Sequence, residues 1–299
     1  MVFETERMRL PVAANGRATR RAVLFRESLP EMAERWALGF AWALTPKRIR
    51  GVPNLLRLCF DEFLAPDYAL PDPETAADEP PGLAGIVHDF TLPTLLAAYR
   101  RGLYPFAHIA PLKWWSPPTR SVLFFNEQHI AKRLRRQMRH DNYTVTFDQA
   151  FDDVIAACAG HRQDRWHLTW ITPRIMRTYA DLFDAGFAHS FEVWNDRGDL
   201  AGGGYGVAIG GAFVTESQFS REPNTSKIGF AVLNWHLAHW GFAFNDGKLM
   251  TPTCHDMGFR EITRREYLDR LAQAGRLLNK TGRWQVETDV ATVADWQPR

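Results

Sequence analysis

Two acidic residues in the second half of the chain could take part in chemistry. Asp246 ends the apolar run FAFND, at the place where an α/β sheet presents polar groups to its crevice. Glu216 lies within a run of apolar and small residues, where an unpaired carboxylate would be costly to bury. Two carboxylates at strand ends could orient an amine. Alternatively, Glu216 is a core acid that is bound to Arg221 or Lys227.

A polar segment, SREPNTSK, ends a predicted strand and opens a predicted helix. Asn224, Thr225 and Ser226 are capping residue types, and the free N–H groups at a helix start attract anions. Arg221 and Lys227 add positive charge. The segment is therefore either an anion site or an ordinary helix cap. It lacks the glycine-rich loop that a coenzyme A pyrophosphate would need, which makes an acetyl-CoA enzyme less attractive.

Glycines are dense in GGGYGVAIG, residues 202–210. A dinucleotide-binding fingerprint needs a helix directly after its glycines, but a strand pattern follows here. The glycines therefore mark either a crowded sheet or a close backbone approach to a ligand. Cys254, His255 and Asp256 are consecutive, so their side chains point in different directions and do not make a catalytic triad.

The composition of the 299 residues limits the class of protein. The net charge of +2 neither demands nor excludes a polyanionic partner. Cys59, Cys158 and Cys254 have no metal-binding spacing, and they indicate free thiols in a reducing compartment. The first residues lack the basic and apolar regions of a signal peptide, and the longest apolar run, residues 38–44, is too short to span a bilayer. We expect a cytoplasmic monomer without a metal or a cofactor.

The elements that must position these residues can be predicted from periodicity and from turn residues. Residues 1–66 form a basic extension with arginines at 7, 9, 17, 20, 21 and 26 and one helix, 29–45. This extension is a solvated arm with a docking helix or, alternatively, a grip on nucleic acid. The predicted helices are 92–101, 127–140, 148–159, 173–186, 225–241 and 264–275, and the predicted strands are 121–125, 144–147, 189–196, 200–210, 211–219, 242–246 and 259–262. The three strands between 189 and 219 predict an antiparallel meander.

With these pieces placed, residues 68–272 resemble the leucyl/phenylalanyl-tRNA–protein transferase family. The resemblance rests on several blocks in the family's order and spacing. They are PPGLAGIVHDFTLPTLLAAYRRGLYPF, KWWSPPTRSVL, VIAACAGHRQDRWHLTWITPRIM, YADLFDAGFAHSFEVWNDRGDLAGGGYGVAIGGAF, ESQFSREPNTSK and, after ND, GFREITRREYL. The resemblance implies an α/β protein with a GNAT-like catalytic domain. We expect that domain at 141–275, a small N-terminal domain at 67–140 and a C-terminal tail at 276–299.

The resemblance also implies an enzyme that moves an amino acid from aminoacyl-tRNA to the N-terminus of an acceptor protein, which marks the acceptor for degradation. Aminolysis of an ester by an amine with a pKa near 7.7–8.0 needs positioning more than a strong base. By position in the family motif, Asp246 is the catalytic acid and Glu216 the site glutamate. We expect both to open into one shared cleft. The residues that the resemblance assigns to the tRNA 3′ end and the aminoacyl group are Trp115, Phe106, Gly204, Phe213, Gln218, Ser220, Asn224, Ser226 and Lys227, with Trp115 stacking on the terminal adenosine.

This chain departs from the family at the reacting centre. The family has Asp-Cys-Gln where this chain has Asp246, Gly247 and Lys248, so a cation replaces an amide. Gly204 replaces a bulky apolar residue, and an amide, Gln218, replaces methionine. A lysine beside Asp246 would repel a basic acceptor. We therefore expect an altered donor or acceptor. Two other functions stay open: a GNAT-like N-acyltransferase with another acyl donor, and a non-catalytic paralogue that binds tRNA or degrons.

Overall fold

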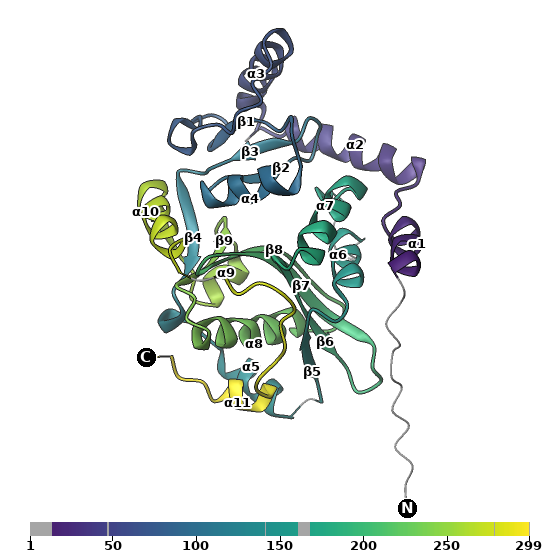
Figure 1. Cartoon of the computed structure of the whole chain (residues 1–299), viewed down its shortest axis with the longest axis vertical. Helices are drawn as coiled ribbons and strands as arrows, with labels where there is room; N and C mark the ends of the chain where they lie inside the picture. Colours follow the sequence, from purple (N-terminus) through teal and green to yellow (C-terminus); the bar gives the residue numbers. More distant parts are fainter. Residues whose placement is uncertain (1–13, 47, 141, 161–167, 278, 299) are drawn as a thin grey trace, which may run out of the picture.

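The computed structural model describes residues 14–46, 48–140, 142–160, 168–277 and 279–298. Two arginines of the predicted basic arm, Arg7 and Arg9, lie outside the described residues. The described chain contains two β-sheets with helices packed around them, and three N-terminal helices at one end and along one flank (Figure 1). The predicted α/β class with a smaller N-terminal region is confirmed. A GNAT-like relationship stays a prediction.

The larger sheet has seven strands in the order β10-β4-β9-β8-β7-β6-β5. Their bounds are β4 (Thr119–Leu123), β5 (Thr144–Phe147), β6 (Ala188–Trp194), β7 (Leu200–Ile209), β8 (Ala212–Ser220), β9 (Phe244–Lys248) and β10 (Arg260–Thr263). The predicted meander of β6, β7 and β8 is confirmed, because both of its pairings are antiparallel. The pairing of β8 with β9 is parallel, and the other neighbours in this sheet are antiparallel.

Helices cover both faces of the larger sheet (Figure 1). On one face lies α8 (Thr225–His239), with α5 (Lys132–His140) and α11 (Val290–Ala294) beyond it. On the opposite face lie α4 (Leu92–Arg100), α6 (Phe151–Ala159) and α7 (Pro173–Asp184). The short helix α9 (Pro252–Asp256) follows β9, and α10 (Arg264–Ala274) follows β10. The alternation of side chains along each strand therefore fills two apolar cores, one on each face.

Three of the element boundaries that differ from the sequence prediction have a clear local reason. β9 begins at Phe244 instead of residue 242 because the backbone N–H of Phe242 still bonds Leu237 O, closing the end of α8. β4 ends at Leu123 because Phe125–Glu127 forms a 3₁₀ turn. This turn also shortens the predicted helix 127–140, which begins at Lys132.

A smaller sheet of three antiparallel strands lies beside α4. It consists of β1 (Leu83–Ile86), β2 (Tyr104–Phe106) and β3 (Lys113–Trp115), in the order β1-β3-β2. We expected a small domain to reach residue 140. However, β4 pairs with β9 and β10 in the larger sheet, and α5 packs against α11. The segment after residue 118 therefore joins the larger sheet, because β4 fills the place between β9 and β10.

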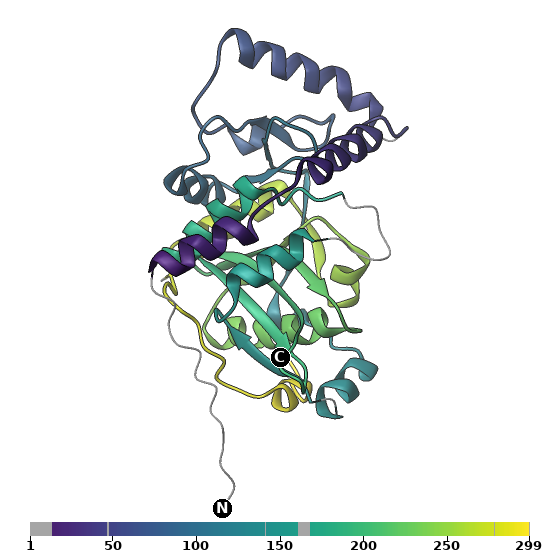
Figure 2. The ribbon, with the colours of Figure 1, turned by 90° about the vertical axis from the view of Figure 1, so that its right-hand side faces the viewer.

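The prediction of one helix in the extension is wrong, since the described part contains three. They are α1 (Ala14–Leu24), α2 (Leu29–Ala43) and α3 (Val52–Leu64). α2 begins with a capping box in which Ser28 and Glu31 bond each other's backbone, as the pattern of acids early in that helix suggested. In Figures 1 and 2, α3 lies at the end of the molecule opposite α11.

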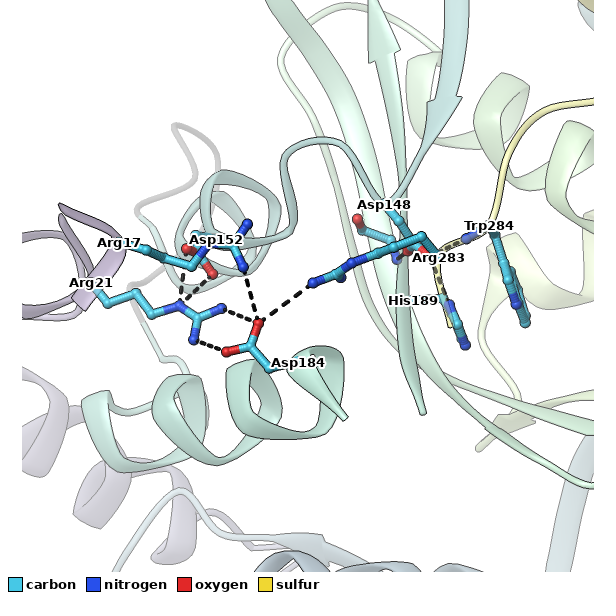
Figure 3. A network of polar contacts seen from close by, with 9 residues as sticks. Arg17, Arg21, Asp148, Asp152, Asp184, His189, Arg283 and Trp284 are labelled. Carbon is cyan, nitrogen blue, oxygen red and sulfur yellow. Dashed lines mark hydrogen bonds and ion pairs between the residues drawn. The ribbon is translucent and has the colours of Figure 1, made fainter. Parts of the chain in front are cut away.

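Arginines of α1 form hydrogen-bonded ion pairs with the rest of the protein (Figure 3). Arg21 bonds Asp152 of α6 at 2.9 and 3.0 Å and Asp184 of α7 at 2.5 and 3.1 Å. Phe25, just after α1, is fully buried in the core with α6 and α7. Burying a phenylalanine contributes about 1.5–3 kcal/mol, more than exposed ion pairs do. Arg17, Arg20 and Arg21 of α1 thus all pair with acids of α6 or α7.

The predicted C-terminal tail is packed against the larger sheet. Trp284 is buried, and its ring stacks on His189 with 3.6 Å between the centroids (Figure 3). Asp148 accepts hydrogen bonds from the Trp284 N–H at 2.7 Å and from the Ser190 N–H at 2.9 Å, and it bonds His189 Nδ1 at 2.9 Å. Burial lowers the pKa of His189, which favours its neutral form. The segment around Trp284 thus closes one edge of the core.

Candidate active site

A groove forms where β8 and β9 separate. Their parallel pairing covers three residue pairs and ends at Val214↔Asp246. Beyond this point β8 continues to Ser220, and among the described residues its strand partner there is β7 alone. The resulting groove has a volume of about 1850 Å³. Its walls are residues 215–222, Ser226 and Phe230 of α8, Gly247 and Lys248, the segment 251–254 with Met257 and Phe259, the β6–β7 turn, and parts of α6 and α1.

Glu216 lines this groove, but its side chain has no exposed surface and is held by three donors. The hydroxyl of Tyr99 donates to Oε1 at 2.8 Å, and that of Tyr179 donates to Oε2 at 3.1 Å. Lys248 Nζ lies 2.8 Å from Oε2. Burial is the main cause that raises the pKa of Tyr99 and of Tyr179 well above the usual value, so both phenols keep their protons and donate. Neither Arg221 nor Lys227 is a partner of Glu216. Arg221 bonds Leu200 O, and Lys227 pairs with Asp256.

Lys248 takes a strained backbone conformation at the end of β9. Its φ of 65° lies in the left-handed region, which is uncommon for residues other than glycine. Its N–H donates to Asp246 Oδ1 at 2.8 Å, which holds this conformation. The ammonium lies over the rings of Tyr104 and Trp170, at 5.4 and 5.6 Å from their centroids. The backbone therefore directs the lysine side chain across the gap toward Glu216.

Asp246 lies beneath this ion pair and does not reach the groove. Its side chain has no exposed surface. It accepts hydrogen bonds from Arg120 Nε at 2.9 Å and Nη2 at 2.7 Å, and from the hydroxyl of Tyr267 at 2.9 Å. With the Lys248 N–H, these donors fill both carboxylate oxygens. The expectation that Asp246 and Glu216 open into one cleft is therefore wrong. The bidentate arginine holds Asp246 in the interior, and the side chain of Glu216 has no exposed surface either.

The predicted aromatic residues form a cluster that meets the site through Trp170. Trp115 is partly buried, and its Nε1–H donates to Phe106 O at 2.8 Å. The ring of Phe106 lies 5.7 Å from that of Trp170, which in turn lies near Lys248 and Tyr179. Trp115 and Phe106 themselves are not among the residues that line the groove. Trp170, Tyr99 and Tyr179 are absent from the predicted site, since no sequence pattern indicates what a buried tyrosine will contact.

At the start of α8, the predicted residues make contacts with the protein itself. Ser220 Oγ accepts the Ser226 N–H at 3.1 Å and donates to Ser226 Oγ at 2.8 Å. Asn224 stands at the cap position with a φ of 66°, but its side chain donates to Gln137 of α5 at 2.9 Å. Lys227 lies 3.4 Å from Asp256. Ser220 and Ser226 line the groove, whereas Asn224 and Lys227 do not.

The remaining predicted residues lie on different faces of the sheet. Gln218 lines the groove. Gly204 pairs with it on β7, and a Cβ at Gly204 would lie 2.7 Å from the ring of Phe191 and 2.8 Å from Gln218. The glycines of β7 therefore permit close packing in this crowded part of the sheet. Phe213 is buried against α8 and does not line the groove, because alternation along β8 points it to the opposite face from Val214.

Two further properties concern the described part of the chain alone. It contains no group of three or more His, Cys, Asp or Glu side chains placed to hold a metal ion. None of its helices is long and apolar enough to cross a membrane.

Comparisons with known proteins agree with the order of the sequence blocks. The model of the family "Leucyl/phenylalanyl-tRNA protein transferase" matches residues 122–272, and the model of that family's N-terminal domain matches residues 88–118. A leucyl/phenylalanyl-tRNA–protein transferase of Stutzerimonas stutzeri (strain A1501) is 42% identical over 232 residues, which cover 77% of this chain and 96% of the relative. One of Pseudomonas fluorescens (strain Pf0-1) is 45% identical over 204 residues, covering 68% and 89%.

A third relative of the same name, from Alkalilimnicola ehrlichii (strain ATCC BAA-1101 / DSM 17681 / MLHE-1), is 40% identical over 230 residues, covering 77% of this chain and 89% of the relative. These matches span nearly the whole of each relative at an identity well above that of chance likeness. The chain therefore belongs to the leucyl/phenylalanyl-tRNA–protein transferase family.

Proposed function

We propose that this protein transfers an amino acid from aminoacyl-tRNA to the N-terminus of an acceptor protein. The relatives carry the name of this activity. The observation that carries the proposal is the Glu216–Lys248 pair at the groove where β8 leaves β9. The groove, at about 1850 Å³, exceeds the usual 300–1,000 Å³ of a small-molecule pocket, so it has room for an esterified nucleotide and a peptide end together.

In this reaction the α-amino group of the acceptor attacks the ester carbonyl, a C–N bond forms and the C–O bond to the ribose breaks. An α-amino group with a pKa near 7.7–8.0 is partly neutral at physiological pH, so the site must mainly hold the two reactants together. Such positioning can supply about 7–11 kcal/mol. Glu216 would orient the amine. Lys248 Nζ would stabilise the negative charge that develops on the carbonyl oxygen, the role of an oxyanion-hole donor.

Asp246 then acts as a positioning residue. It bonds the Lys248 backbone at 2.8 Å and is itself fixed by Arg120. The family resemblance assigns the catalytic acid to Asp246, but its oxygens are already occupied by donors. The oxygens of Glu216 are occupied as well, but its partner Lys248 is 12% exposed and lines the groove. We therefore assign the contact with the reacting groups to the Glu216–Lys248 pair, which a substrate reaches through Lys248.

The tRNA would approach over the start of α8. The neighbouring helix α5 carries three exposed cations, Lys132, Arg133 and Arg136. Asn224 and Pro223, before α8, contact Gln137 of the same helix. Phosphates of the acceptor stem would bind these cations. Trp115 would stack on the terminal adenosine if the base reaches the cluster of Phe106 and Trp170.

Lys248 also bears on which acceptor is used. A free Glu216 carboxylate would attract a basic first residue, but the lysine ammonium at 2.8 Å balances that charge. We propose that this protein discriminates less in favour of basic acceptors than a site with a neutral amide at position 248 would. We further propose that the activity operates in the cytoplasm and marks its acceptors for degradation.

The activity can be tested with the purified full chain, total aminoacyl-tRNA and peptides that differ in their first residue. Mass spectrometry should show peptides extended by one amino acid at the N-terminus, and it identifies both donor and acceptor. Free amino acids without tRNA should give no product. Tight tRNA binding without extension of any peptide would favour the non-catalytic binding function, and extension by acyl-CoA would favour another acyl donor. Either result would overturn the proposal.

The tRNA surface can be tested by changing Lys132, Arg133 and Arg136 to alanine together. We expect weaker tRNA affinity and a smaller dependence of the binding constant on salt, because each lost phosphate contact removes about one released counterion. A matched variant changes two exposed arginines elsewhere, Arg265 and Arg276, and should leave both properties unchanged. An equal loss in both variants would show that the effect comes from net charge alone.

A further inference from the structure

The helices α2 and α3 of the extension each expose a stripe of large apolar side chains. On α3 the stripe repeats at the spacing of one helix face, with Leu56 66%, Phe60 61%, Phe63 83% and Leu64 66% exposed. On α2 it consists of Leu29, Met32, Trp36 and Phe40. We call these eight residues the apolar end surface. Exposed stripes of this kind are typical of a helix that packs against a partner.

The other faces of both helices already pack against the body. Gly39 of α2 lies so close to the backbone of residue 108 that a Cβ there would be 2.9 Å from His108 O. Asn54 of α3 donates to Glu79 O at 2.7 Å, and α3 packs against β1. The two stripes therefore lie on faces of α2 and α3 that the body leaves exposed, and α3 itself lies at the end of the molecule (Figure 2).

We propose that the apolar end surface is the contact of a homodimer, in which it meets the same surface of a second copy of this chain. The first argument is size. Eight half-exposed large side chains, several of them aromatic, offer about 600–900 Å². A stable interface buries about 800 Å² on each partner, whereas the largest apolar patch of a typical monomer is about 300–600 Å². The two stripes together therefore offer about the area that each partner of a stable dimer buries.

The second argument is charge. Arg57 and Asp61 lie side by side on α3, 3.6 Å apart and 83% and 62% exposed. In a two-fold dimer, the two copies of α3 would lie antiparallel to each other. The Arg57–Asp61 pair of one copy would then face the same pair of the other copy in reverse order. Arg57 of each copy then lies near Asp61 of the other. The surface is therefore self-complementary, as the contact of a two-fold dimer must be.

The charges also distinguish a second copy from other occupants. α2 carries Glu31, Glu34 and Arg35, and α3 carries Arg57, Asp61 and Glu62, so each helix has a net negative charge. Membrane-surface helices are instead rich in Lys and Arg beside their apolar face. The monomer that the sequence analysis expected would leave the apolar end surface in water.

Sedimentation of the full chain over a range of concentrations tests the dimer. We expect a reversible dimer, and we expect Phe60→Asp and Phe63→Asp each to weaken its dissociation constant at least tenfold. Both residues are exposed, so the melting temperature at a concentration where each protein is monomeric should change little. Val23→Asp on α1, which replaces an apolar residue of similar exposure at 62%, should leave the dissociation constant unchanged.

A charge exchange tests the antiparallel arrangement. Arg57→Asp and Asp61→Arg should each weaken the dimer a few-fold, since like charges then face each other across the axis. The double variant restores opposite charges and should recover the dissociation constant of the unchanged protein. A monomer at all concentrations, or a dimer that is indifferent to both phenylalanine variants, would overturn the proposal. So would a monomer that binds vesicles of anionic lipid through Phe60 and Phe63.

Discussion

The inner end of β9 and the outer half of β8 each hold a carboxylate that is bound by a cation and by tyrosine hydroxyls. Asp246 of β9 is bound by Arg120 and Tyr267, and no part of it is exposed. Glu216 of β8 is bound by Lys248, Tyr99 and Tyr179. Its side chain is likewise unexposed, but the residue lines the groove and its partner Lys248 is 12% exposed there. Similar chemistry is thus closed off in the interior in one region and meets the groove through Lys248 in the other. The difference arises because the strands separate after Val214↔Asp246.

The largest expected effect is on the buried pair. Asp246→Asn leaves the guanidinium of Arg120 without its counter-charge in the interior, which costs about 3–5 kcal/mol. Urea unfolding should show this loss of stability, and transfer activity should fall with it. Glu216→Gln should destabilise the fold less, because Lys248 keeps contact with the groove. If Asp246→Asn leaves the stability unchanged, Asp246 does not mainly support the structure. It would then again be a candidate for contact with the reacting groups.

A third carboxylate, that of Glu192 on β6, adds to this comparison because it is buried with no cationic partner among the described residues. Burial raises the pKa of Glu192 on β6 to about 7, with hydrogen bonds from Ser190 and Thr146 opposing the shift. The folded chain therefore holds this proton more tightly than the unfolded chain, whose glutamate has a pKa of 4.5. The stability that Glu192 contributes is fully present below pH 4.5 and is lost as the pH rises through 7.

Glu192→Gln should remove this pH dependence, up to about 3 kcal/mol for a shift of this size. Urea unfolding at several pH values between 4 and 8 would measure it, as the difference between the variant and the unchanged protein. Glu266→Gln on α10 provides the control, because Glu266 is a surface acid paired with Arg270. A difference between Glu192→Gln and the parent that stays constant with pH would contradict the expectation.

The pair at the groove is expected to set a preference among acceptors. Lys248→Gln should raise the ratio of kcat/KM for Arg-first over Asp-first peptides about tenfold, since no lysine then balances the negative charge of Glu216. Glu216→Gln should lower the same ratio by a similar factor, since no carboxylate then balances the positive charge of Lys248. Competition assays with both peptides measure the ratio directly. Equal losses for both peptides in both variants would mean that the pair is structural.

The smallest expected effects come from two matched tyrosine substitutions, one in each region. Tyr267→Phe removes one donor from Asp246, and Tyr99→Phe removes one from Glu216. Each should cost about 1–2 kcal/mol of stability, because a donor to a buried carboxylate is lost. Only Tyr99→Phe should also lower kcat/KM, by a few-fold at a temperature where both proteins are folded. An equal fall in kcat/KM for Tyr267→Phe would indicate that Asp246 also belongs to the reacting centre.

The sequence by itself determined most of the local structure and the family. Period-two patterns predicted the β6–β8 meander, and apolar periodicity with glycine stops predicted α7, α8 and α10 within a few residues. The motif blocks named the family that the comparisons confirm. These features depend on near neighbours in the chain, so a short stretch of sequence contains the information that specifies them.

The tertiary structure alone decided which residues meet. Glu216 pairs with Lys248 and not with Arg221, because β9 lies parallel to β8 and Lys248 turns back with a positive φ. Asp246 is buried because β4, from a distant part of the chain, brings Arg120 beside it. Likewise, α1 docks through acids on α6 and α7 that lie more than 100 residues away. Such contacts arise from the register and order of strands, which side-chain periodicity within one segment does not specify.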